Sequence, residues 1–118
     1  MENKEYLSND LSLYQFSPES QYLDRKSARK KPQELLKHLI AFANADGGQL
    51  VVGIEDEKQD NIITGFKDGR SYPIDDFKKI DREMRETPLD LSFEEIPVVN
   101  HKGEDDVILV ISVELSSN

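Results

Sequence analysis

Apolar residues recur every three to four positions between residues 32 and 45, which is the spacing of one face of an α-helix. Pro32 suits the first turn of this helix, because the ring of proline fixes a helical φ. The glycines of Asp46-Gly47-Gly48 follow the last apolar position, and glycine takes the left-handed conformation that ends a helix. The pattern therefore predicts a helix from Pro32 to this corner.

Strand patterns flank the predicted helix. Residues 49–55 form a nearly continuous apolar run, which indicates a strand buried on both faces. Residues 107–114, VILVISVE, show the strongest strand pattern of the chain. Further strands are expected at residues 22–26, at 62–66 as the returning arm of a hairpin, and at 89–98.

Three other segments are less regular. An apolar stripe predicts a second helix over residues 75–86. The apolar positions of the strand at 89–98 change from odd to even numbers, so we expect a bulge near Glu94-Glu95. Ser17-Pro18 has the residues of a helix start, a capping serine and then proline. Residues 1–16 are expected to form a short helix or an edge segment.

These elements predict the fold class. Alternating helices and strands of this kind give an α/β (α+β) two-layer sandwich, with two main helices on a mixed sheet of about five strands. The 118 residues fit a single domain, since about 100–150 residues is the commonest domain size. We therefore expect one domain over residues 1–118.

Composition excludes several classes of protein. The chain has no cysteine, which excludes disulfides and thiolate metal sites, and its two histidines, His38 and His101, do not favour a His-rich zinc site. Its start has no apolar segment of the signal-peptide kind. The longest apolar runs have five residues, whereas a membrane span needs about 20. We expect a cytoplasmic protein without membrane contact.

The charge of the chain is unevenly distributed. The net charge is −9, yet residues 25–31, RKSARKK, contain five cations and no acid. Lysine and arginine pair with nucleic-acid phosphates, whereas a solvated helix start is the alternative interpretation. Tyr22 is the one aromatic residue close to this segment in the sequence, which gives little support for a stacking platform. The candidates for phosphate contacts are Lys26, Arg29, Lys30 and Lys31, with Arg25 a weaker one.

Several motifs resemble the Schlafen AlbA-like domain. The most specific is IAFANADGG at residues 40–48, which matches the Ala-Phe-Ala-Asn-x-x-Gly-Gly corner of that family. LVVGIED at 50–56 and ITGF at 63–66 match its hairpin, and Glu19-Ser20 with LDRK at 23–26 matches its Glu-rich segment. The resemblance covers roughly residues 19–113. It implies an Alba-like fold and a nucleic-acid-binding domain, the N-terminal module of a bacterial transcriptional regulator that binds DNA.

The same resemblance implies an alternative function, a ribonuclease-type nuclease that depends on Mg²⁺ or Mn²⁺. Some animal Schlafen proteins cleave RNA with acids of this core, and the matching catalytic and metal-binding positions are Glu19, Asp24 and Asp56, with Glu55 as the alternate for Asp56. Asp24 stands where the family usually has glutamate, and Arg25 where it usually has phenylalanine. Glu19 and Asp24 converge only if Glu19 lies on the turn before the strand. The alternative interpretation is that these are surface acids at strand ends.

A third hypothesis is an oligomerisation or interaction module. Strand 107–114 would pair across the interface of a homodimer. Outside residues 25–31 the chain has 10 basic and 24 acidic residues, a balance that favours partners other than nucleic acid.

Overall fold

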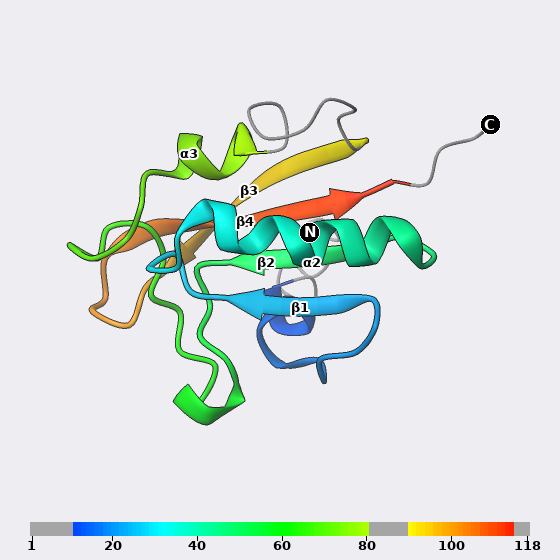
Figure 1. Cartoon of the computed structure of the whole chain (residues 1–118). Helices are drawn as coiled ribbons and strands as arrows, with labels where there is room; N and C mark the ends of the chain where they lie inside the picture. Colours follow the sequence, from blue (N-terminus) through cyan, green and yellow to red (C-terminus); the bar gives the residue numbers. More distant parts are fainter. Residues whose placement is uncertain (1–10, 81–89, 115–118) are drawn as a thin grey trace, which may run out of the picture.

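A computed structural model describes residues 11–80 and 90–114 (Figure 1). Its sheet has four strands in the order β1-β2-β4-β3. β1 and β2 are parallel, whereas β2 with β4 and β4 with β3 are antiparallel. The predicted α/β class with a mixed sheet is confirmed, with four strands in place of about five. The strands are β1 (Leu23–Lys26), β2 (Gly48–Val52), β3 (Leu91–Val99) and β4 (Asp105–Val113).

Helix α2 (Pro32–Asn44) connects the two parallel strands and confirms the predicted helix. The N–H of Lys31 donates to the Glu34 carboxylate over 3.1 Å, which satisfies one backbone donor at the start of the helix. At the other end Gly47 has a φ of 89°, and its N–H donates to the Phe42 carbonyl over 2.9 Å. A Cβ on Gly48 would overlap the Phe42 ring, so the second glycine lets the helix pack directly against the sheet.

Both faces of the sheet carry a hydrophobic core. On one face, α2 and the short helix α3 (Ile74–Lys78) pack over Leu50 and Val52 of β2. On the other face, Val51 contributes to a second cluster, against which the helix at residues 11–16 packs. Figure 1 shows α2 and the dark-blue helix 11–16 on opposite sides of the sheet. The prediction that β2 is buried on both faces is therefore confirmed.

The predicted returning strand at residues 62–66 is wrong. Ile54 and Ile63 form only an isolated bridge. The N–H groups of Thr64 and Gly65 both donate to the Gly53 carbonyl, over 3.0 and 2.9 Å, and Gly53 and Gly65 have positive φ values of 111° and 64°. The chain therefore turns where the apolar pattern predicted an extended ladder.

The predicted bulge in β3 is also wrong. β3 pairs with β4 in one unbroken register, from Leu91 opposite Val113 to Val99 opposite Asp105. Leu91 packs against the core under α2, whereas Ile96 and Val98 pack against the core on the opposite face. The apolar positions change from odd to even numbers because the two ends of β3 bury opposite faces of the strand.

Two more expectations need correction. A helix ends, and does not begin, at Ser17-Pro18, because the Ser17 N–H donates to the Leu13 carbonyl over 3.0 Å. β4 lies between β2 and β3, so its flanks are already paired and it cannot supply the edge of a homodimer sheet.

The second predicted helix is confirmed at α3, and its residues 81–86 lie outside the described residues. Within the described part of the chain, no helix has the length and apolar character to cross a membrane.

Candidate nucleic-acid interface

A basic pocket lies between the end of β1 and the first half of α2. Its volume is about 210 Å³. The residues on α2 are spaced three or four apart, or adjacent, so they face one side of the helix. The pocket thus combines cations from a strand, a loop and a helix. Its lining comprises Lys26 of β1, Lys30 of the loop, and Glu34, Leu35, Lys37 and His38 of α2.

The predicted cations differ in whether their side chains form ion pairs. The side chains of Lys30 and Lys31 are exposed, and neither has an ion pair within residues 11–80 and 90–114. Lys26 Nζ lies 3.5 Å from the Asp24 carboxylate. Of the four predicted cations, the two without an ion pair are therefore in the loop that leads into α2.

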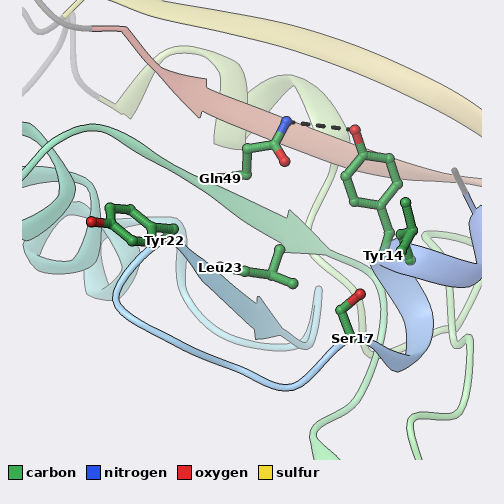
Figure 2. A pocket seen from close by; sticks show the side chains of 6 residues that line it. Tyr14, Ser17, Tyr22, Leu23 and Gln49 are labelled. Atoms are coloured by element: carbon green, nitrogen blue, oxygen red, sulfur yellow. Dashed lines mark hydrogen bonds between the residues drawn. The ribbon is translucent and has the colours of Figure 1, made fainter.

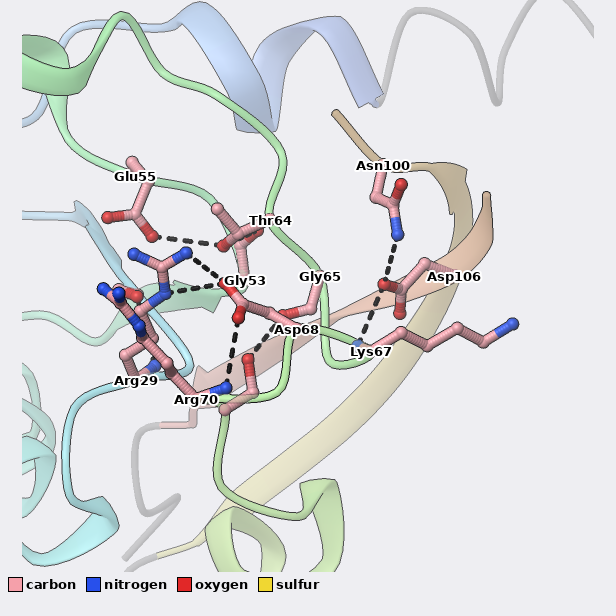
Figure 3. Close-up of polar contacts among 12 residues, drawn as sticks. Arg29, Gly53, Glu55, Thr64, Gly65, Lys67, Asp68, Arg70, Asn100 and Asp106 are labelled. Carbon is pink, nitrogen blue, oxygen red and sulfur yellow. Dashed lines mark hydrogen bonds and ion pairs between the residues drawn. The ribbon is translucent and has the colours of Figure 1, made fainter. Parts of the chain in front are cut away.

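Arg29 is paired with Asp68, which lies in the loop before α3. Its Nε donates to Asp68 Oδ2 over 2.7 Å (Figure 3), and the Asp68 side chain is almost buried. The pKa of Asp68 is lowered by a hydrogen bond from the Arg70 backbone N–H and by the bond from Arg29. Arg29 thus ties the basic loop to the rest of the fold.

Arg25 is a structural residue. Only 1% of it is exposed, its Nε donates to the Tyr14 carbonyl over 2.6 Å, and its Nη2 donates to the Ser17 carbonyl. Its side chain therefore points away from the basic pocket and anchors the helix at residues 11–16. Burial and these two hydrogen bonds explain why an arginine fits at this position of β1.

Glu19 and Asp24 form a carboxyl pair. Both accept the Arg25 backbone N–H, over 3.0 and 2.8 Å, because Glu19 lies just before the turn that leads into β1. A hydrogen bond with Asp24, together with burial, raises the pKa of Glu19. Burial works to raise the pKa of Asp24, but the bond from Glu19 and the charge of Lys26 outweigh it and lower this pKa. The two carboxyl groups thus differ in their pKa values, and Glu19 takes up a proton before Asp24 as the pH falls.

Asp56 and Glu55 have partners elsewhere. The Asp56 carboxylate accepts the Lys58 backbone N–H over 3.1 Å, at the start of the short 3₁₀ helix η1 (Glu57–Gln59). Glu55 accepts the Thr64 hydroxyl over 3.1 Å. Across the described residues, no three His, Asp or Glu side chains are grouped so that they could hold a metal ion. The fold therefore brings Glu19 and Asp24 together without making Asp56 part of a three-acid group.

His38 connects the acids with the basic pocket. Its Nδ1 lies 3.4 Å from Asp24 Oδ2. Burial and the neighbouring charges of Lys26 and Lys37 lower the pKa of His38, and Asp24 opposes this effect. His38 also lines a second pocket of about 260 Å³, on the side of α2 that leads toward Phe42.

Lys37 and His38 are the residues that sequence reasoning missed. They lie on the same helical face as Glu34, which was a usable signal. Their closeness to Lys26 depends on the parallel pairing of β1 with β2, which places α2 against β1.

A comparison with protein families identifies the domain. The family described as Schlafen, AlbA_2 matches residues 19–118, a range that contains all four strands and α2. The chain belongs to the Schlafen, AlbA_2 family. Such domains are commonly associated with nucleic-acid binding in regulators. No curated protein gives a significant match to the chain.

The signature corner of this Schlafen AlbA_2 domain is scaffold. Gly47 and Gly48 follow the C-terminal end of α2, where the helix dipole disfavours anions. The basic pocket lies toward the N-terminal end of the same helix, where the dipole favours them. A phosphate is thus expected at the Lys30 end of α2 and not at the glycines.

Proposed function

We propose that this domain binds nucleic acid, and specifically DNA as part of a bacterial transcriptional regulator, through the β1–α2 surface. This surface is defined by Lys26, Lys30, Lys31, Lys37 and His38. The observation that carries the proposal is the convergence of lysines from a strand, a loop and a helix on one concave pocket, in a chain of net charge −9. Membership of the Schlafen, AlbA_2 family supports it.

The chemistry of the pocket suits a phosphodiester backbone. Lysine ammonium groups neutralise phosphates and release condensed counterions, which gives a salt-dependent affinity with little sequence preference. Arg29 contributes indirectly, because its bond to Asp68 fixes the loop that carries Lys30 and Lys31. The acidic remainder of the molecule repels nucleic acid elsewhere, which restricts binding to this surface.

Binding at two salt concentrations tests the proposal. Labelled single strands and duplexes are titrated with the wild type, with Lys30→Gln/Lys37→Gln, and with Lys102→Gln as the control, since Lys102 is exposed on the β3–β4 turn. We expect the double variant to bind more weakly and the slope of log Kd against log salt to fall by about 1.4 for a single strand, at about 0.7 per phosphate contact. No binding by the wild type at low salt, or equal binding by wild type and double variant, would contradict the proposal.

A second candidate is metal-dependent RNA cleavage, favoured by the closeness of Glu19 and Asp24. Mg²⁺ commonly uses one or two carboxylates together with phosphate and water, so this pair is the part of the family pattern that could hold Mg²⁺ or Mn²⁺. Asp56 does not complete a three-acid site in the described structure, and we therefore place this function second. Incubation of RNA with Mn²⁺, with EDTA as the blank, tests it: cleavage that Asp24→Asn abolishes supports it, and cleavage by Asp24→Asn at the wild-type rate rejects it.

A further inference from the structure

A third pocket lies on the other face of β1. Its volume is about 310 Å³, at the lower end of the range of about 300–1,000 Å³ typical of small-ligand sites. Successive side chains of a strand point to opposite faces, so Leu23 faces this pocket while Asp24 faces α2. Figure 2 shows the pocket between the helix at residues 11–16 and the parallel pair β1–β2. It is lined by Leu13, Tyr14, Ser17, Tyr22, Leu23 and Gln49.

The lining combines aromatic rings with one fixed amide. Tyr14 and Tyr22 come from different segments and both line the pocket, and in Figure 2 their rings lie on either side of Leu23 and Gln49. Tyr22 is the one aromatic residue close to residues 25–31 in the sequence, and the fold adds Tyr14 to the lining of the same pocket. The Gln49 amide nitrogen donates to Ser112 Oγ over 3.1 Å and to the Tyr14 hydroxyl over 3.5 Å, which leaves its carbonyl oxygen as an acceptor.

Among the described residues that line this pocket, none has a charged side chain. The nearest cation in the strand, Arg25, is buried and donates to the Tyr14 and Ser17 backbone carbonyls. A phosphate would therefore find no cationic partner among these lining residues. The lining favours a flat, largely apolar ligand with a polar edge, and two of its apolar members are well exposed, Leu13 at 58% and Tyr22 at 46%.

We infer that this pocket receives an unpaired nucleobase of the bound nucleic acid, an inference that rests on the proposed function. Bases stack on aromatic side chains in single-strand sites, and amide groups read their polar edges. β1 is an edge strand, so a nucleic-acid strand can pass around it from the basic pocket to this one. Leu23 and Lys26 are three residues apart, about 10 Å along an extended strand, so a few nucleotides span both pockets. A base held in a duplex cannot enter, and the domain therefore prefers single strands or unpaired ends.

The first test compares single strands with duplexes. Tyr22→Ala removes one stacking ring, Tyr22→Phe keeps it, and Val99→Ala is the matched control, because Val99 is 59% exposed on the far edge strand β3. We expect Tyr22→Ala to weaken single-strand binding about tenfold, with duplex binding unchanged and with Tyr22→Phe and Val99→Ala both close to wild type. Equal losses for single strand and duplex, or no loss for either, would overturn the inference.

The second test separates this inference from the proposed function. Free nucleosides carry no phosphate, so they probe the base pocket alone. We expect a nucleoside titration to shift the NMR signals of the Leu23 backbone amide and the Gln49 side-chain amide in the wild type, and Gln49→Ala to weaken that response. If oligonucleotides bind through Lys30 and Lys37 while nucleosides shift neither signal, the base pocket is refuted and the proposed function stands. If nucleosides bind and oligonucleotides do not, the proposed function fails, and the inference that the base belongs to a bound strand fails with it, although the pocket itself binds nucleosides.

Discussion

At the scale of single residues, buried polar side chains hold the loops that carry the candidate site. Asp106 is the clearest case, because only 8% of it is exposed. Its carboxylate accepts the backbone N–H groups of Phe66 and Lys67, over 2.9 and 3.1 Å, and the Asn100 side-chain amide over 3.0 Å (Figure 3). A Cβ on Gly65 would overlap this carboxylate. Asp106 therefore fixes the segment that leads to Asp68, the partner of Arg29.

Asp106→Asn is expected to lower the free energy of unfolding by about 1–3 kcal/mol, because an amide cannot accept all of these hydrogen bonds. Burial works to raise the pKa of Asp106, but these hydrogen bonds lower it below its ordinary value of 3.8. Its contribution to stability is therefore present above pH 3.8 and is lost as the pH falls through the lowered pKa. Urea unfolding at neutral and acidic pH measures both effects. Equal stability of the two proteins at neutral pH would contradict this role.

His38 makes binding depend on pH. Asp24 and Lys26 face it from β1, and Lys37 is its neighbour on α2. Because burial and the charges of Lys26 and Lys37 lower the pKa of His38 below its ordinary 6.5, the imidazole gains its charge at a lower pH than a free histidine does. We expect nucleic-acid affinity to rise as the pH falls below 6.5, because His38 becomes charged, and to rise less for His38→Gln. Anisotropy titrations of both proteins across this range give the comparison, and parallel pH profiles would exclude His38 from the surface.

At the scale of elements, periodicity predicted those parts that depend on local pattern. α2 and β4 were predictable, because their apolar spacing matches the faces that they bury. The turn at residues 62–66 was not, since it depends on hydrogen bonds to Gly53 and Asp106 that join distant segments. The bulge was predicted wrongly for a similar reason: one strand, β3, contacts two different cores.

Arg25 shows how a packing role can resemble a binding role in the sequence. We expect Arg25→Ala to lower the free energy of unfolding by about 1.5–3 kcal/mol, because the carbonyls of Tyr14 and Ser17 lose a charged donor. Thermal or urea unfolding measures this loss. Nucleic-acid affinity of the folded variant should stay near wild type. A variant with unchanged stability but reduced affinity would contradict this role and indicate that Arg25 contacts phosphate.

At the scale of the whole molecule, charge and topology together define the proposed surface. The basic run at residues 25–31 could be predicted from the sequence, but the different roles of its cations could not. Arg25 is buried, Arg29 is paired, and Lys30 stands beside Lys37 only because the chain crosses from β1 through α2 to β2. The edge strand β1 therefore separates a basic pocket from an aromatic one. The central claim is that nucleic acid binds across this edge.

NMR mapping tests that claim most directly. A single-stranded oligonucleotide is titrated into the labelled domain, and amide shifts are followed across the chain. We predict the largest changes in residues 22–38 and at Gln49, which surround the two pockets, and little change in the β3–β4 turn at residues 100–104. Shifts confined to that turn, or an absence of shifts at Lys30 and Lys37, would contradict the account.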